Sequence, residues 1–300
     1  MQAPFVSVII PVLNDSKRLV LCVEALERQT YPREQYEIIV VDNGSSEDVE
    51  PCLRPFDRVV LAHEPAPGPA AARNKGIALA RGEVLAFTDS DCIPDEDWIE
   101  KGARSLLTHP YCGMAAGGID FMFSNPARPT VCELYDSMMY LQQRRYVEKR
   151  RFGATANLFT LKSVIDDVGL FDDVTYNLSA CEDTDWGWRV FDKGYKQIYA
   201  QEARVRHPAR HEFRELYKKL IRTIEGRASF ENKWSVSKRT SERLGAWRDN
   251  VNWSLNRAAI IVKEPGLKGK RVGLLFLALF LLIVRLMMVM RFSMLKYKKA

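Results

Sequence analysis

Two acids that directly follow a short apolar run constrain this chain more than any other feature. The run, residues 84–87, has the length and composition of a strand buried on both faces, and Pro94 is typical of a helix start. Asp89 and Asp91 therefore lie at the carboxyl end of a strand, where ligands collect in open α/β sheets. Two hard oxygen ligands there suit a magnesium or manganese ion that carries phosphate oxygens. The alternative for Asp-x-Asp alone is a polar turn followed by a helix cap.

Two more apolar runs end in polar residues in the same way. Residues 6–12 lead to Asn14, and residues 36–41 lead to Asp42. Strands that alternate with helical patterns over the first hundred residues predict an α/β fold with a doubly wound, mostly parallel sheet flanked by helices. Parallel strands end at the same edge, so we expect these two residues and the acid pair to meet there.

Four short motifs occur in order along this part of the chain. They are Ser7-Val-Ile-Ile-Pro-Val-Leu-Asn14, Ile39-Val-Val-Asp-Asn-Gly-Ser-Ser46, Gly68-Pro-Ala-Ala-Ala-Arg-Asn-Lys-Gly76 and Phe87-Thr-Asp-Ser-Asp91. Together they resemble the successive signatures of the family 2 glycosyltransferases, which have the GT-A fold and invert configuration. The resemblance covers residues 5–210. Its specificity comes from the combination, because each motif alone is weak.

The resemblance implies a site for a nucleotide-sugar donor. Its contacts would come from the ends of the first strands and from the helix before the metal strand, at Pro11, Val12, Asn14, Asp42, Arg73 and Asp89. In the family, Asp42 and the backbone near Asn14 would read the nucleobase. Arg73 would face the diphosphate, and Asp89 would reach the ribose or the ion.

A histidine follows the last expected strand. A lone histidine such as His207 is more often a surface residue or a satisfied core residue, although a neutral imidazole is also the commonest nitrogen ligand of metals. In GT-A enzymes a histidine at this place often completes the metal shell. The resemblance therefore implies Asp89, Asp91 and His207 as ligands of Mn²⁺ or Mg²⁺, with His211 less well placed.

A second group of acids opens a helix near residue 182. Glu182, Asp183 and Asp185 crowd its first turn, where the helix dipole favours negative charge. The dipole accounts for acids at a helix start, but not for three of them within four positions. The resemblance implies that Asp183 is the catalytic base, with Glu182 beside it as a second catalytic residue and Asp185 in support. A base must come within hydrogen-bond distance of the acceptor hydroxyl.

The acceptor and the donor sugar are expected between residues 117 and 190. The resemblance implies contacts from Asn157, Asp185 and Trp186, although an ordinary buried asparagine is the alternative for Asn157. The charged run at residues 144–151 has two interpretations. It is either the solvated face of a surface helix or part of the region that shapes acceptor choice.

The C-terminal third is strongly basic. Residues 201–300 hold 23 Lys and Arg against 8 Asp and Glu, a balance of +15, which leaves −9 for residues 1–200. Residues 272–284 are wholly apolar, and Arg285 interrupts the run before residues 286–290. A basic tail beside an apolar run suits an anionic membrane surface better than a nucleic acid. We expect membrane attachment and leave open whether the segment crosses the bilayer. The alternative is a buried oligomerisation helix.

Cellular location is predicted from what the termini and the cysteines suggest. Six scattered cysteines without C-x-x-C spacing suggest reduced thiols, and the first residues lack the pattern of a secretory leader. We therefore expect the cytoplasmic face of the inner membrane. The expected domains are residues 1–210 as the GT-A domain, residues 211–264 as a helical extension, and residues 265–300 as the membrane-associated segment.

The resemblance, together with these features, implies a metal-dependent inverting hexosyltransferase. It would move a sugar from a nucleotide-diphosphate donor to a hydroxyl of a glycan or lipid-linked acceptor, with no nucleic-acid partner. One alternative is an inactive membrane-bound scaffold of the same fold, which the intact acids at 89, 91 and 183 argue against. The other is a nucleotidyltransferase, which would need a glycine-rich basic loop in place of residues 11–14.

Overall fold

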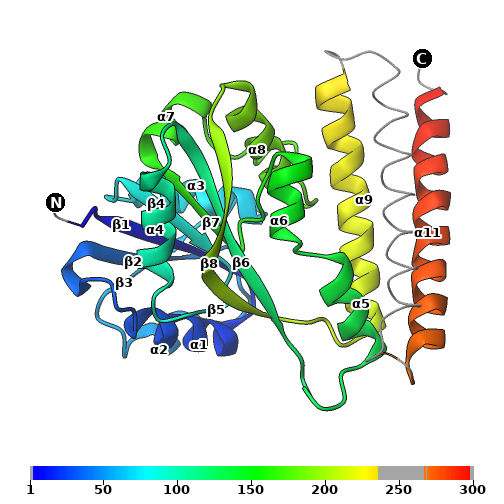
Figure 1. Ribbon diagram of the computed structural model, residues 1–300, viewed down its shortest axis with the longest axis horizontal. Coiled ribbons are helices and arrows are strands. Elements are labelled where there is room, and N and C mark those ends of the chain that lie inside the picture. The colour runs from blue at the N-terminus through cyan, green and yellow to red at the C-terminus, as the bar shows by residue number, and fades with distance from the viewer. Residues whose placement is uncertain (1–2, 236–266, 268, 298–300) are drawn as a thin grey trace. The chain divides into compact units, whose positions relative to one another are not determined.

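The computed structural model describes residues 3–235, 267 and 269–297, and Figure 1 shows its elements. The strands are β1 (Val6–Val12), β2 (Tyr36–Asp42), β3 (Val59–His63), β4 (Val84–Thr88), β5 (Ile93–Pro94), β6 (Cys112–Met122), β7 (Asn157–Leu161) and β8 (Lys196–Pro208). The longer helices are α1 (Ser16–Glu27), α3 (Pro69–Leu79), α4 (Trp98–Thr108), α5 (Val131–Met139), α7 (Lys162–Val168), α8 (Glu182–Asp192), α9 (Phe213–Ser235) and α11 (Arg271–Tyr297). The short ones are η1 (Arg33–Gln35), α2 (Glu50–Leu53), α6 (Gln143–Arg145) and η2 (Tyr146–Arg150).

The eight strands form one sheet in the order β3-β2-β1-β4-β7-β6-β8-β5. The strands β3, β2, β1 and β4 are parallel, as the alternation of strands and helices predicts. In the other half, β7 runs antiparallel to both β4 and β6, and β8 runs antiparallel to β5. The sheet is therefore mixed, and its parallel half carries the strand ends that the sequence singles out.

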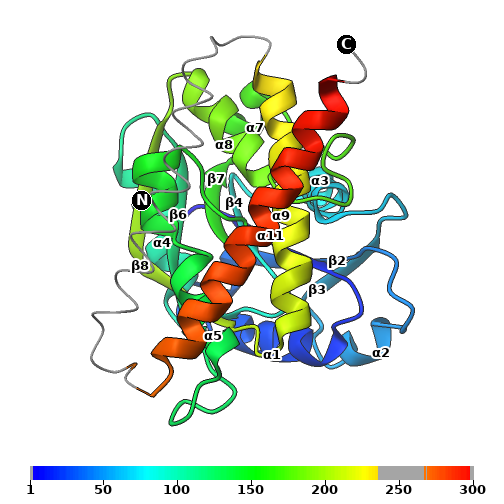
Figure 2. The same cartoon turned by 90° about the vertical axis from the view of Figure 1, so that its right-hand side faces the viewer.

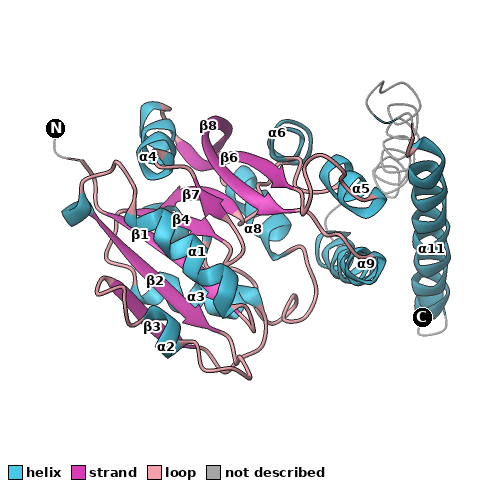
Figure 3. Cartoon of the chain, turned by 90° about the horizontal axis from the view of Figure 1, so that it is seen from below, coloured by secondary structure: helices cyan, strands magenta, loops and turns pink. Residues whose placement is uncertain are grey.

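Helices cover both faces of the sheet, as Figure 3 shows. Side chains alternate along a strand, so Val8 and Ile10 of β1 pack on one face with α1 and α4. Ile9 lies on the opposite face, in a core that α3 and α8 complete. Because both faces are covered, β1, β2 and β4 are almost entirely buried, which explains their apolar sequences.

Small residues in α3 allow this helix to lie close to the sheet. Ala70 and Ala72 are fully buried, and a Cβ atom at Gly76 would lie 2.4 Å from Ile9 Cγ2. The close approach brings Arg73, on the same helix, next to the carboxyl end of β4.

The chain divides into two compact units. One comprises residues 1–121 and 141–208, and the other comprises residues 122–140 and 209–300. The sequence analysis placed residues 122–140 inside the first domain, whereas the structure groups them with the C-terminal helices. The reason is that α5 packs on α9 and α11 through its own apolar face. Of the expected extension at residues 211–264, residues 236–264 lie outside the described part.

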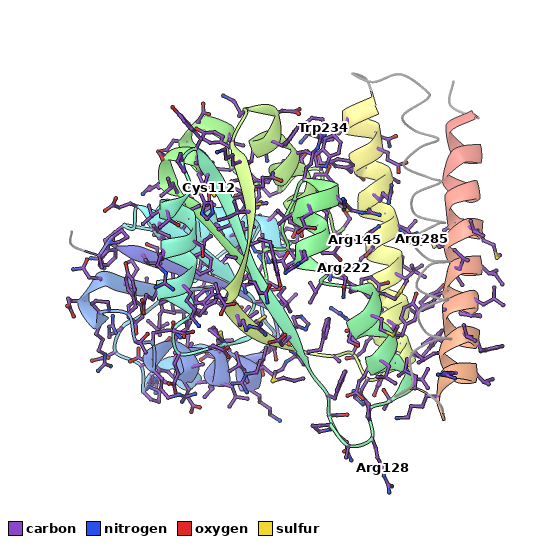
Figure 4. All side chains as sticks on the ribbon, viewed as in Figure 1. Cys112, Arg128, Arg145, Arg222, Trp234 and Arg285 are labelled. Atoms are coloured by element: carbon purple, nitrogen blue, oxygen red, sulfur yellow. The ribbon has the colours of Figure 1, made fainter. Side chains whose placement is uncertain are left out.

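In the second unit, α5, α9 and α11 share a separate apolar core, and α9 packs against α11 (Figure 2). Leu274, Leu277 and Leu281 of α11 are buried in this core, whereas Phe276 and Met287 are 72% and 61% exposed. The helix continues past Arg285, which Figure 4 labels. Residues 271–288 have a mean hydropathy of 2.3, so within the described residues α11 is long and apolar enough to cross a membrane. One such helix is weak evidence of membrane attachment.

Candidate active site

The ends of β1, β2 and β3 lie side by side. Pro11 is half-buried and Val12 is buried in β1, where Val12 pairs with Asp42, and Asp42 pairs with His63. The buried Asp42 carboxylate accepts the backbone N–H of Ser45 at 3.0 Å, and its second oxygen lies 3.3 Å from His63 Nδ1. The edge therefore offers a fixed carboxylate next to an imidazole that is 67% exposed.

Asn14 joins the loops that follow β1 and β2. Its backbone has φ 53°, a left-handed conformation that asparagine tolerates better than most residues. Its side-chain oxygen accepts hydrogen bonds from the N–H and the hydroxyl of Ser46, at 2.7 and 2.9 Å, and its own N–H donates to Ser45 Oγ at 2.8 Å. The structure therefore gives Asn14 a clear part in shaping the loop, while its role in donor binding stays a prediction.

The pairing of β5 with β8 brings His207 to Asp91. Ile93 pairs with Arg206, so His207, the next residue of β8, lies beside the residues that precede β5. His207 Nε2 lies 3.7 Å from an Asp91 carboxylate oxygen, and both lie near the Cys92 thiol. The ligand atoms of these three side chains lie within 4.8 Å of one another, a spacing that suits a metal ion.

A hydrogen bond at Nδ1 of His207 determines which ring nitrogen is left to bind a metal. His207 is buried, and its Nδ1 lies 2.7 Å from the carbonyl oxygen of Pro208. A carbonyl oxygen only accepts, so Nδ1 carries a proton, and in the neutral ring Nε2 is the nitrogen that can bind a metal. A second hydrogen bond of this kind orients most histidines that bind metals.

Cys92 differs from the other two residues of the group. Burial, reinforced by the charges of Asp91 and Asp89, raises the pKa of its thiol well above the usual value. The thiol lies 3.7 Å from the carbonyl oxygen of Ala156, to which it donates. An imidazole and a carboxylate suit manganese or magnesium better than a thiol does, so we expect Asp91 and His207 to be the protein ligands.

Arg73 joins the two groups of acids that the sequence singles out. Its Nη2 donates to Asp89 at 2.8 Å, and its Nη1 donates to Glu182 at 3.0 Å. The guanidinium is buried, and its Nε has no hydrogen-bond partner among the described residues. Burial disfavours the charge, but Asp89 and Glu182 outweigh it, so the pKa of Arg73 is raised. The structure thus brings Asp89 to Arg73, and the group of possible metal ligands does not include it.

Asp183 follows Glu182 in the first turn of α8. Its carboxylate is half-buried and accepts the N–H of Thr184 at 2.6 Å. The preceding residue, Cys181, has φ 90°, a conformation that is costly for a residue with a Cβ atom. A strained residue therefore directly precedes Glu182 and Asp183, and strained residues concentrate at functional sites.

Tyr146 contributes a partly buried phenol to the surroundings of Asp183. Its ring stacks on Phe152 with a centroid distance of 4.6 Å. Burial, together with the negative charge of Asp183, raises the pKa of Tyr146 to about 12. The phenol therefore stays protonated at neutral pH, and it can donate a hydrogen bond.

The expectation that Asn157 contacts the sugar or the acceptor is not met. Asn157 is completely buried, and its oxygen accepts the Trp98 indole N–H at 2.9 Å. Its amide nitrogen donates to the carbonyl oxygens of Gly118 and Ala203, at 2.8 and 2.9 Å. All of these partners are protein groups, so the structure favours the alternative of a satisfied core asparagine.

Replacement of Asn157 should therefore affect stability rather than substrate binding. We expect Asn157→Ala to lower the free energy of unfolding by about 3 kcal/mol, because the buried Trp98 N–H and two carbonyl groups lose their partner. Urea denaturation measures the change. Unchanged stability together with a raised KM for the acceptor would instead return Asn157 to the substrate site.

Asp185 and Trp186 are also core residues. Asp185 is fully buried and pairs with Arg189, four residues further along α8, at 3.0 Å. Trp186 is fully buried, donates its indole N–H to the Gly169 carbonyl at 3.0 Å and packs against Phe171. Asp185 therefore stabilises α8 through its ion pair with Arg189. The other two acids of this turn, Glu182 and Asp183, are the candidates for the site.

Three residues near the site were not singled out from the sequence. Arg18 lies 3.6 Å from Asp91, on the first turns of α1. His63 is the last residue of β3 and lies beside Asp42, and its position at the end of an apolar run was a signal that could have found it. Tyr146 lies within a charged run, and nothing in the local pattern distinguishes it from a surface tyrosine.

Comparison with known proteins identifies the family. A profile described as Glycosyl transferase family 2 matches residues 7–169. Glycosyltransferase AglE of Haloferax volcanii is 36% identical over 249 residues, which cover 81% of this chain and 80% of AglE. The chain belongs to glycosyl transferase family 2. The resemblance seen in the four motifs is confirmed, and glycosyl transfer of the family 2 kind is the activity class.

Solved structures confirm the GT-A fold of this family 2 glycosyltransferase. The mannosyltransferase PcManGT of Pyrobaculum calidifontis, in complex with GDP-Man and Mn²⁺, is 16% identical with a TM-score of 0.61 over 95% of this chain and 75% of its own. GalNAc-T7 with UDP, GalNAc and Mn²⁺ is 17% identical with a TM-score of 0.54, over 70% of this chain and 44% of its own. At such identities the likeness shows the fold alone.

Proposed function

We propose that this glycosyltransferase is an inverting, divalent-cation-dependent enzyme that moves a hexose from a nucleoside-diphosphate sugar to a hydroxyl of a glycan or lipid-linked acceptor. The observation that carries the proposal is the buried Arg73, which contacts Asp89 at the end of the metal strand and Glu182 beside the expected base. Acids far apart in the sequence thereby lie around one guanidinium.

On the donor side, we propose that Asp91 and His207 hold the cation. A carboxylate oxygen and an imidazole lone pair fit Mn²⁺ or Mg²⁺, and the Pro208 carbonyl already orients the ring. When bound, the cation would neutralise charge on the leaving nucleoside diphosphate. Asp42 would accept hydrogen bonds from the nucleobase, next to the backbone of Pro11, Val12 and Asn14.

On the acceptor side, we propose Asp183 as the base. Its carboxylate would take the proton of the acceptor hydroxyl, whose oxygen then attacks the anomeric carbon from the face opposite the diphosphate. Tyr146 would donate a hydrogen bond from its neutral phenol, and Glu182, held by Arg73, would fix the start of α8.

We also propose that the enzyme works at the cytoplasmic membrane face. Support comes from the apolar residues 271–288 of α11 and from the excess of Lys and Arg in the C-terminal third. Residues 1–121 and 141–208 would then be the catalytic unit, and the membrane segment would begin near residue 265. Flotation of the full chain with anionic and with neutral liposomes tests the attachment.

A thermal-shift screen of nucleoside diphosphates, with and without Mn²⁺, tests the donor site. A ligand that binds only the folded state raises Tm according to its affinity, so one base should give a Mn²⁺-dependent shift. Metal-dependent hydrolysis of the matching nucleotide sugar separates an enzyme from an inactive scaffold. Absence of any shift with every base would sink the proposed function.

The metal ligands give a sharper prediction. We expect His207→Ala to remove most of the Mn²⁺-dependent part of the shift and to lower metal-dependent hydrolysis at least about tenfold, because one of two protein ligands is lost. His211→Ala is the matched control, since His211 is exposed and lies in the second unit. An equal loss in both variants would remove His207 from the metal site.

A further inference from the structure

Asp91 has different neighbours on the two oxygens of its carboxylate. Its Oδ1 lies 3.7 Å from His207 Nε2 and 3.9 Å from the sulfur of Cys92. Its Oδ2 lies 3.6 Å from Nη1 of Arg18, on α1. The possible metal ligands therefore lie on one side of this carboxylate, and a guanidinium lies on the other.

Asp15 holds Arg18 in this place. The Arg18 Nε donates to Asp15 Oδ1 at 2.7 Å, a normal length for a hydrogen bond between charged groups, whereas 3.6 Å to Asp91 is too long for one. Asp15 Oδ2 also accepts the hydroxyl of Ser90 at 3.3 Å. The ion pair of Nη1 with Asp91 is therefore an attraction between charges rather than a hydrogen bond.

The place of Asp15 at the start of α1 does not by itself account for these contacts. An aspartate at the N-cap of a helix usually accepts a backbone N–H of the first turn, but the Asp15 side chain makes no such bond in the described structure. It binds Arg18 and Ser90 instead. Ser90 directly precedes Asp91, and α1 packs beside β5, which follows it (Figure 1). The first turn of α1 is thus attached to the segment that carries the expected metal ligand.

The charge of Arg18 opposes a cation that binds without other ligands. A cation held by Asp91 and His207 would share the Asp91 carboxylate with this guanidinium, and like charges at such close range repel each other. Removal of the guanidinium would leave the carboxylates of Asp15 and Asp91 without its positive charge. The site would then attract a divalent cation more strongly.

A diphosphate reverses the sign of this effect. The Arg18 side chain is 52% exposed, so a ligand can reach its guanidinium beside Asp91. Guanidinium groups match the geometry of phosphate oxygens and stay charged at every working pH. A diphosphate that binds the cation brings negative charge to the same place, and this charge offsets the repulsion between the cation and Arg18.

We propose that Arg18 couples the binding of the cation to the binding of the donor diphosphate. It weakens binding of the cation alone and strengthens binding of the cation and the diphosphate together. Linkage then requires each of the two ligands to raise the affinity of the other by the same factor. The inference rests on the proposed function and adds Arg18 to the same donor site.

Mn²⁺ binding to the full chain without nucleotide tests the first half of the proposal. The paramagnetic resonance signal of free manganese measures it. Arg18→Gln should bind Mn²⁺ about tenfold more tightly than the wild-type chain, because residues around the ligands of a metal site change its affinity by about 10–100-fold. Arg18→Lys keeps the charge and should bind Mn²⁺ about as the wild type does.

Calorimetry in saturating Mn²⁺ tests the second half, with ADP, CDP, GDP, UDP and dTDP as the probes. For the probe that the wild-type chain binds most tightly, Arg18→Gln should weaken binding about tenfold, since one charge-assisted contact is lost. The variant therefore gains affinity for one ligand and loses affinity for the other. Damage to the fold would instead weaken both.

Lys17→Gln is the matched control. Lys17 is exposed in the same turn of α1, so the change removes the same charge from the same element. Both affinities should stay within about twofold of the wild type, because water and salt screen the charge of an exposed side chain. Equal effects of Lys17→Gln and Arg18→Gln would assign the effect to the net charge of α1 and overturn the proposal.

Three other results would also overturn it. In the first, the wild-type chain binds Mn²⁺ equally tightly with and without the diphosphate, a comparison that needs no variant. In the others, Arg18→Gln binds Mn²⁺ alone no more tightly than the wild type, or binds the diphosphate just as tightly. If the wild-type chain binds one of the nucleoside diphosphates, these results reject only the role of Arg18. If it binds none of them, with or without Mn²⁺, the proposed function itself has failed.

Discussion

Asp183→Asn should lower turnover by about 10²–10⁴-fold while the Mn²⁺-dependent thermal shift by the nucleoside diphosphate stays unchanged. The amide keeps the size of the side chain but cannot take the acceptor proton, and general bases contribute rate factors of this order. Asp183 is half-buried at the start of α8, whereas the donor contacts lie at the strand ends, so donor binding should not depend on its charge. Steady-state transfer and thermal shift on the same preparation measure the two effects.

A matched control lies at the other end of the same helix. Asp192→Asn removes an exposed carboxylate from the last turn of α8 and should leave turnover within twofold. Retained turnover in Asp183→Asn, or an equal loss in both variants, would show that Asp183 is not the base.

Arg73→Ala should both destabilise the protein and stop transfer. The change leaves Glu182 buried, and Asp89 partly buried, without the cation that pairs with each of them. Removal of one partner from a buried ion pair typically costs about 3–5 kcal/mol. We expect a loss of this size in urea denaturation, together with turnover below detection, because the start of α8 loses its link to the end of β4.

Arg73→Lys separates charge from geometry. An ammonium group keeps the positive charge but lacks the planar fork with which Nη1 and Nη2 reach two different carboxylates. Stability should recover in part, while kcat stays low and the donor KM changes little. If Arg73→Ala instead raises only the donor KM and leaves stability and kcat intact, Arg73 is a diphosphate contact and nothing more.

Much of the fold follows from apolar runs that end in polar residues. Strands buried on both faces need continuous apolar sequence, so residues 84–87 and 36–41 are recognisable without any structure. Their carboxyl ends meet because parallel strands share an edge, which is why the structure brings Asp42 next to Val12. The antiparallel half of the sheet was not predictable, because long-range pairing leaves no local pattern.

Side-chain partners explain the errors among the candidate site residues. A buried asparagine and a substrate-binding asparagine look alike in sequence, and only coordinates show that Asn157 donates to Gly118 and Ala203. Asp185 is different, because Arg189 four residues later was a visible signal of an ion pair along the helix. Arg73 and Glu182 are 109 residues apart in the sequence, and no spacing pattern predicts a contact over such a separation.

The central claim is that Asp91 and His207 hold a cation, while Asp183, which follows the Glu182 that Arg73 binds, takes the acceptor proton. A crystal structure with Mn²⁺ and the preferred nucleoside diphosphate, with the anomalous manganese signal recorded, tests it most directly. We expect the manganese peak between the Asp91 carboxylate and His207 Nε2, with the diphosphate lying between that peak and Asp183. A peak away from His207, or a diphosphate on the far side of the sheet from Asp183, would contradict the claim.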